Sequence, residues 1–192
     1  MVYSTQDNKN GTGSKNTNND CLIIVLTFVG GVIILILACV IINSLVPSNP
    51  VSFASSSLRI AIPKDTTVII DEYSEPSFPT GDGYSWTVLQ IQTDKIDEFK
   101  ESLKNSSDWK PLPLPKELAE NEQFLQPTFM SGVEGEIPIA SATGYYIFID
   151  EQKEGKQSSD IATPFYERFS FNYRFGLFND KDGRLYIWSI DT

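Results

Sequence analysis

The stretch Phe169-Ser-Phe-Asn-Tyr-Arg-Phe-Gly-Leu-Phe178 decides the fold, together with the Asn179-Asp-Lys-Asp-Gly183 run after it and the Arg184-Leu-Tyr-Ile-Trp-Ser-Ile190 run that follows. In the first run, aromatic or aliphatic side chains occupy every second position, which is the spacing of a β-strand with a buried face. Aspartate and glycine in the second run favour a tight turn. The three runs therefore predict a β-hairpin.

Segments before the hairpin extend this pattern. Gly144–Asp150 is rich in aromatic residues and predicts a third strand, and Tyr84–Thr93 alternates as a strand does. Asp94–Leu103 has the spacing of an amphipathic helix with Asp94 as its N-cap, and Lys116–Phe124 predicts a second short helix. We therefore expect an α+β domain, mainly an antiparallel β-meander covered on one face by one or two helices.

A second decisive segment is the apolar run from Leu22 to Ile42, which contains no charged residue. At about 1.5 Å per residue, a helix of this length spans roughly 31 Å, the thickness of the hydrocarbon core of a bilayer. A helix is required there because every backbone N–H needs an internal partner. Residues 22–42 are therefore predicted to contact the lipid bilayer as a single transmembrane helix.

The form and the direction of this anchor rest on few residues. Ile36-Leu-Ala-Cys39 resembles a bacterial lipoprotein box, in which Cys39 would carry the lipid, but apolar residues continue to Val46. A retained helix is the favoured interpretation and a lipoprotein anchored at Cys39 is the alternative. Lys9 and Lys15 precede the run, and no basic residue follows it until Arg59, which predicts a cytoplasmic N-terminus and an external domain.

The chain then divides into four parts. Prolines at positions 47 and 50 are expected to end the membrane helix, and the serines up to Ser57 predict a flexible spacer. Short β-branched runs at 58–62 and 66–70 predict the first strands of the domain. The predicted parts are a disordered polar tail (1–20), the transmembrane helix (21–46), a linker (47–57) and an extracytoplasmic α+β domain (58–192).

Composition excludes several kinds of chemistry. The chain has no histidine, and both cysteines lie within residues 21–46, so the domain lacks thiol nucleophiles and histidine or thiolate metal ligands. Charges in the tail cancel, so the net charge of −10 falls on the domain. An acidic domain is a poor partner for nucleic acid. We predict no catalytic residue, no cofactor, no metal and no nucleic-acid partner.

Three features could carry chemistry but have a simpler interpretation. Asp180-Lys-Asp-Gly183 resembles part of a calcium loop, yet it lacks the distal glutamate and fits a turn. Asp71-Glu72 and Glu98 with Glu101 are carboxylate pairs, which catalyse only in surroundings that separate their pKa values. Surface charge is the favoured interpretation of both pairs.

Other segments point to structure more than to binding. Ser141 lies among small residues with no lysine at a recognised catalytic spacing. Leu112-Pro-Leu-Pro115 could dock in an aromatic groove of a partner, but its prolines equally suit an extended crossing within the domain. Trp109, just before it, is predicted to be a core residue.

An ordered series of motifs runs through residues 66–192. It comprises Gly81-Asp-Gly83, Trp109 with Leu112-Pro-Leu-Pro115 and Leu118, Gly144-Tyr-Tyr with Phe148 and Asp150, Phe171-Asn-Tyr-Arg-Phe175, Leu185-Tyr186 and Asp191-Thr192. This series resembles a family of short membrane-anchored or lipoprotein-like proteins of low-GC Gram-positive bacteria, for which no activity is known. The resemblance implies a bacterial envelope location and one intact domain. Members often have a histidine before the Gly-Asp-Gly turn, where this chain has Ser77-Phe-Pro-Thr80.

These observations favour a single-pass membrane protein that is not an enzyme. Its external domain is predicted to bind another protein or a component of the cell wall. An immunity protein that masks a toxin with an acidic face is one form of this function. The alternative is a carboxylate-based hydrolase of the envelope, which requires two acidic side chains in one concave pocket.

Overall fold

The computed structural model describes residues 29–37, 49–74, 82–130, 132–155 and 162–192. They fall into two units, Met1–Val46 and Pro47–Thr192. In the first unit, residues 29–37 form a helix. Among the residues described, no helix is long and apolar enough to cross a membrane. The polar tail, Cys39 and the rest of the predicted span lie outside the described residues, so the membrane anchor stays a prediction.

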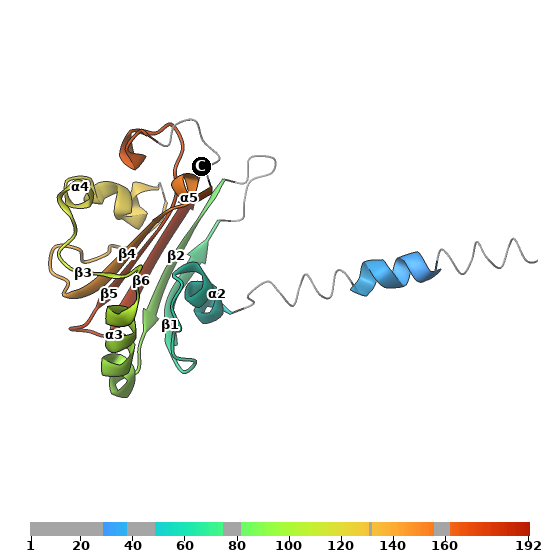
Figure 1. Cartoon of the computed structure of the whole chain (residues 1–192), viewed down its shortest axis with the longest axis horizontal. Coiled ribbons are helices and arrows are strands. Elements are labelled where there is room, and N and C mark those ends of the chain that lie inside the picture. The colour runs from blue at the N-terminus through green and yellow to red at the C-terminus, as the bar shows by residue number, and fades with distance from the viewer. Residues whose placement is uncertain (1–28, 38–48, 75–81, 131, 156–161) are drawn as a thin grey trace, which may run out of the picture. The chain divides into compact units, whose positions relative to one another are not determined.

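A six-stranded antiparallel sheet in the order β1-β2-β6-β5-β4-β3 forms the centre of the second unit (Figure 1). The predicted α+β class and the meander of its last three strands are confirmed. The strands are β1 (Thr67–Tyr73), β2 (Gly83–Gln90), β3 (Lys110–Pro111), β4 (Gly144–Asp150), β5 (Asn172–Asn179) and β6 (Arg184–Asp191).

The predicted hairpin is β5 and β6, which pair from Asn172 opposite Asp191 to Asn179 opposite Arg184. Gly183 closes the turn with a φ of +69°, a conformation that side chains with a Cβ rarely adopt. A Cβ at this position would also lie 2.6 Å from the Cδ1 atom of Ile96. The strand begins three residues later than predicted, because Phe169 is exposed and precedes the pairing.

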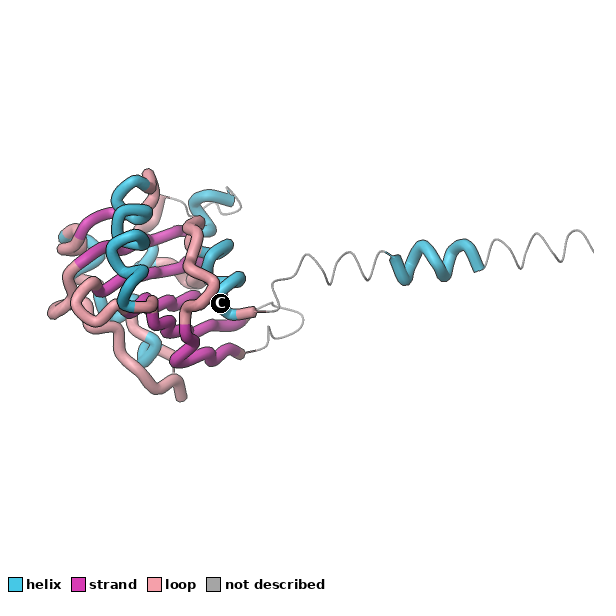
Figure 2. The backbone as a smooth tube through the Cα atoms, turned by 90° about the horizontal axis from the view of Figure 1, so that it is seen from below, coloured by secondary structure: helices cyan, strands magenta, loops and turns pink. Residues whose placement is uncertain are grey.

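Both faces of the sheet carry apolar side chains, so the predicted cover on one face is incomplete. Two separate cores result, one on each face, and Figure 2 shows helices and loops around the strands. The first core includes Trp86, Val88, Tyr173, Phe175, Tyr186, Trp188 and Ile190, and the second includes Leu89, Ile147, Ile149, Phe178, Leu185 and Ile187.

The first face is covered by the long segment between β3 and β4 and by the segment before β5. The helix predicted at 116–124 is divided here into α4 (Lys116–Ala119) and a 3₁₀ turn, Glu122–Leu125. Leu118 and Leu125 are buried in the first core. Further 3₁₀ turns at Pro127–Phe129 and Phe165–Glu167 complete the cover.

The second face is covered by α2 (Pro50–Ser57) and α3 (Ile96–Asn105) (Figure 1). The amphipathic pattern of α3 is confirmed, since Phe99 and Leu103 are buried against the sheet. Asp94 is not its N-cap. It lies inside a 3₁₀ turn, Thr93–Lys95, whose flanking residues make no side-chain cap hydrogen bond.

Helix α2 replaces the flexible spacer predicted at 47–57. The Asn49 side chain accepts a hydrogen bond of 2.7 Å from the Val51 N–H, and Pro50 occupies the first turn, as in a capped helix start. A proline, which cannot continue a helix, can therefore begin one. Val51 and Ala54 are buried in the second core, so α2 belongs to the domain.

Leu58, at the end of α2, packs against the sheet. Residues 58–62 do not form the predicted strand. The side chain of Leu58 is fully buried, and the Leu58 carbonyl accepts a hydrogen bond of 3.2 Å from Trp109 Nε1. Gly176 makes room for it, because a Cβ there would lie 3.0 Å from Leu58 Cδ2 and 2.9 Å from Ile147 Cγ2. Trp109 is therefore a core residue, as predicted.

This packing predicts that the domain begins before Leu58. A fragment of residues 58–192 loses the burial of Val51 and Ala54, which should lower its free energy of unfolding by about 2–4 kcal/mol relative to residues 47–192. Urea unfolding of both fragments measures the difference. In the longer fragment, Ala54→Asp should destabilise similarly, whereas Ser52→Asp on the exposed side should change the value by less than about 0.5 kcal/mol. Equal stability of the two fragments would contradict the assignment of α2 to the domain.

Candidate functional site

The second face of the sheet changes from apolar to polar along three neighbouring strands. The change occurs at the same end of β2, β6 and β5, because antiparallel pairing places Ser85 opposite Ser189 and Ser189 opposite Arg174. The apolar half of this face is covered by α2 and α3, and the other half is polar. The polar half consists of Ser85 and Thr87 on β2, Ser189 and Asp191 on β6, and Asn172 and Arg174 on β5.

A groove of about 560 Å³ lies over this polar half. Helix α2 contributes Pro50 and Phe53 to its lining, and the edge strand β1 contributes Asp71 and Tyr73. A solvated sheet face is ordinarily polar, but here a helix lies along it, so the polar surface is hollowed and not flat. The groove is therefore the candidate binding site of the domain.

The serine pair in the groove is unusual in its hydrogen bonding. The hydroxyl oxygens of Ser85 and Ser189 are buried, and neither has a hydrogen-bond partner in the part of the chain that the structure describes. Buried polar atoms without partners are rare in proteins and call for an explanation such as water or a ligand. Both oxygens lie beneath the surface of the groove, so a ligand reaches the exposed carboxylates and aromatic rings of the lining and not these hydroxyls.

Acidic side chains lie at two ends of the groove. Asp71 Oδ1 accepts a hydrogen bond of 3.2 Å from Thr87 Oγ1. At the other end, burial and the nearby carboxylates of Asp82 and Glu151 raise the pKa of Asp191 above its ordinary value. A carboxylate whose surroundings disfavour its negative charge is a natural partner for a positive charge.

Arg174 is the only basic residue among the described residues that line the groove. Its guanidinium lies 3.3 Å from a carboxylate oxygen of Glu151 and 3.4 Å from the carbonyl of Ser57 at the end of α2. The positive charge of Arg174 is therefore paired within the protein. Arg174 thus connects the end of α2 to the start of α5 (Glu151–Gly155).

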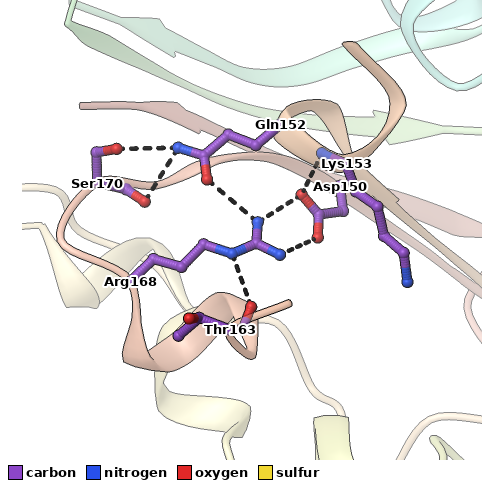
Figure 3. A network of polar contacts seen from close by, with 6 residues as sticks. All are labelled: Asp150, Gln152, Lys153, Thr163, Arg168 and Ser170. Carbon is purple, nitrogen blue, oxygen red and sulfur yellow. Dashed lines mark hydrogen bonds and ion pairs between the residues drawn. The ribbon is translucent and has the colours of Figure 1, made fainter. Parts of the chain in front are cut away.

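A second polar network holds α5 in place (Figure 3). Arg168 faces Asp150 with two hydrogen bonds of 2.7 and 2.8 Å, and its Nε donates to the Thr163 carbonyl at 3.0 Å. Asp150 also accepts from the Lys153 N–H, which caps α5. Both side chains of the ion pair are mostly buried, at 6% and 15% exposed. The network thus fixes the position of Glu151, the next residue after Asp150.

The carboxylate pairs considered from sequence do not come together as pairs. Asp71 and Glu72 point to opposite faces because they are neighbours on a strand, and only Asp71 lines the groove. Glu98 and Glu101 are exposed on α3, where they pair with Lys95 at 3.2 Å and with Lys104 at 3.3 Å.

The remaining sequence candidates have structural contacts. Asp180 accepts hydrogen bonds from Lys100 and Thr143, and these lower its pKa. Ser141 receives Lys181 on its backbone carbonyl at 3.0 Å, not on its hydroxyl. Leu114 of the proline-rich segment is buried in the first core. Within the described ranges, no group of three acidic, histidine or cysteine residues is placed to hold a metal ion.

The two acidic residues of the groove are too far apart to act as a catalytic pair. Asp71 aligns through β2 with Ile187 on β6, four residues before Asp191. Two strand spacings of about 4.8 Å and four residues of about 3.4 Å separate their Cα atoms by roughly 16 Å. Carboxyl groups that cooperate in glycoside hydrolysis are about 5–9.5 Å apart. This arrangement suits binding of an extended ligand better than acid–base catalysis.

Sequence reasoning missed this site, although a signal was present. In each of the three strands, the residues on the second face change from apolar to polar part of the way along. Leu185 and Ile187 are followed by Ser189 and Asp191, for example. This signal can be recognised only when the strand register is known, because the register places the polar ends of β2, β6 and β5 side by side.

No protein-family model, curated protein or solved structure matches this chain. The resemblance to short membrane-anchored proteins of Gram-positive bacteria therefore stays a prediction.

The environment of Asp191 predicts a pH-dependent cost in stability. Because its pKa is raised in the folded state, the folded protein binds the proton more tightly than the unfolded chain, and stability falls as the pH rises through the range where aspartate ionises, from about 4 upward. Asp191→Asn should raise the Tm at pH 7, and the gain should vanish near pH 3. Thermal unfolding across this range measures it. The exposed Glu134→Gln serves as control, and an equal gain from it would contradict a specific effect at Asp191.

Proposed function

We propose that this chain is a single-pass membrane protein whose extracytoplasmic domain is a non-catalytic interaction module. The lipid bilayer would hold residues 22–42, and the groove over the polar half of the sheet would receive the partner, a protein or a cell-wall component. The uncharged run of sequence supports the anchor. The groove, lined by two exposed carboxylates and two exposed aromatic rings, is the observation that carries the binding function.

Binding explains the site better than hydrolysis does. A hydrolase needs two carboxyl groups close to one bond. The two acidic residues that line the groove, Asp71 and Asp191, are roughly 16 Å apart at their Cα atoms, and the acidic neighbours of Asp191, which are Asp82 and Glu151, do not line it. A binding groove needs separated contacts along a ligand, and here they are two carboxylates and two exposed aromatic rings. An immunity protein, which would mask a toxin in this groove, is one form of the same function.

Cysteine labelling in cells that express the full chain tests both parts of the proposal. Tyr73→Cys places a thiol in the groove, and Ser107→Cys places one on an exposed loop after α3. A membrane-impermeant maleimide should label both in intact cells, since the domain is proposed to be external. The unsubstituted chain, whose two cysteines are Cys21 and Cys39, gives the background.

A partner in the groove should protect one thiol and not the other. We expect Tyr73→Cys to react at least threefold more slowly in intact cells than in the purified chain, with Ser107→Cys reacting equally in both. Labelling only after lysis would contradict the external location. Equal rates at Tyr73→Cys in cells and in the purified chain would contradict the presence of a partner.

A further inference from the structure

The charges of the groove indicate which class of partner it fits, and this inference rests on the function proposed above. Arg174 has its charge paired with Glu151 at 3.3 Å. The side chains of Asp71 and Asp191 have no basic partner among the described ion pairs. The groove is therefore negative, on a domain that already carries the net charge of −10. Positive groups complement it, and anionic ones are repelled.

Exposed aromatic rings at the groove add to this preference. Phe53 is 39% exposed on α2, and Tyr73 is 67% exposed on β1. Both line the groove although large apolar side chains normally prefer burial. An aromatic face attracts a lysine or arginine side chain, which can lay its apolar stem along the ring and leave its charge for a carboxylate.

The spacing of the acidic residues restricts the ligand further. The Cα atoms of Asp71 and Asp191 are roughly 16 Å apart, as estimated from strand geometry. Two side chains four residues apart on an extended peptide are about 14 Å apart at their Cα atoms, and long basic side chains cover the remainder. Ser85 and Ser189 lie on the sheet between the two ends, and because their hydroxyl oxygens are covered, the middle of the peptide rests on the groove surface above them.

We infer that the groove binds an extended basic segment of a partner protein, with one lysine or arginine at Asp71 and a second, four residues along, at Asp191. The segment crosses β2 and β6 between these residues, over Ser85 and Ser189. The raised pKa of Asp191 agrees with this arrangement, because a bound cation offsets the repulsion that Asp82 and Glu151 exert on the Asp191 carboxylate.

The test uses the full chain in phosphatidylcholine nanodiscs, which carry no net charge. Three fluorescent pentapeptides are titrated and followed by anisotropy: Lys-Ser-Thr-Ser-Lys, its isomer Lys-Lys-Ser-Thr-Ser, and Glu-Ser-Thr-Ser-Glu. We expect the first to bind at least threefold more tightly than the second, and the acidic peptide not to bind. Affinity for the first should fall as salt is raised, because exposed charge pairs are screened.

Matched variants separate the groove from the general acidity of the domain. Exposed charge pairs each change affinity by roughly two- to fivefold, so Asp71→Asn with Asp191→Asn should weaken binding of the first peptide about tenfold. Glu134→Gln with Glu136→Gln removes the same charge from an exposed loop and should change binding by less than twofold. Circular dichroism confirms that both double variants are folded.

Defined outcomes would overturn the inference. They are native-like binding of the first peptide by the Asp71→Asn, Asp191→Asn variant, or binding of the acidic peptide as tight as that of the basic one. If Tyr73→Cys is protected in cells while no basic peptide binds, the partner is of another class and the proposed function stands. If the thiol is also unprotected, the proposed function fails together with the inference.

Discussion

Ile187 and Trp188 are neighbours on β6, point to opposite faces of the sheet and are both buried. The same holds along much of β5, so the centre of the sheet is apolar on both sides. Each such side chain is worth about 1.5–3 kcal/mol when it is removed from water. Neither face of the sheet can therefore be exposed to solvent, and other segments of the chain must cover both. The loop-rich segment before β4 supplies one covering layer, and α2 with α3 supplies the second.

The second layer covers only part of its face, and the groove follows from this. Leu58 and Trp109 close the apolar half over Gly176, whereas α2 passes beside the polar half. Arg174 holds the end of α2 near Glu151, and the Asp150–Arg168 pair holds the helix that begins with Glu151. Contacts with the end of α2, with the start of α5 and with the segment before β5 thus hold the side chains around the groove in place. Such rigidity suits a binding site, since little ordering is needed when a ligand enters.

The sequence was sufficient where local patterns decide the structure. The β5–β6 hairpin, β4 and α3 follow from alternation, from turn residues and from helical spacing, and all are confirmed. Helix α2 was missed because Pro50 was interpreted as the end of a helix, whereas it begins one, and because the serine-rich sequence of α2 has little amphipathic pattern. Its stability comes from burial of Val51 and Ala54 against strands far away in the chain. No local pattern reports such burial.

The site was harder to predict than the fold, for a related reason. Asp71 was noted from sequence, but beside Glu72, with which it shares no face of the sheet. Its relation to Ser85, Ser189 and Asp191 depends on the register of two strand pairs, β1 with β2 and β2 with β6, which the hydrophobic pattern alone does not define. A cluster made by register becomes visible only after the strands have been aligned.

The central claim is that α2 is part of the domain and forms one side of the groove. Hydrogen exchange of the backbone amides of residues 54–58 in the full chain tests it most directly. A docked helix predicts protection at these amides similar to that in α3, because opening them exposes the second core. Exchange at the rate of an unstructured peptide, with α3 still protected, would contradict the claim.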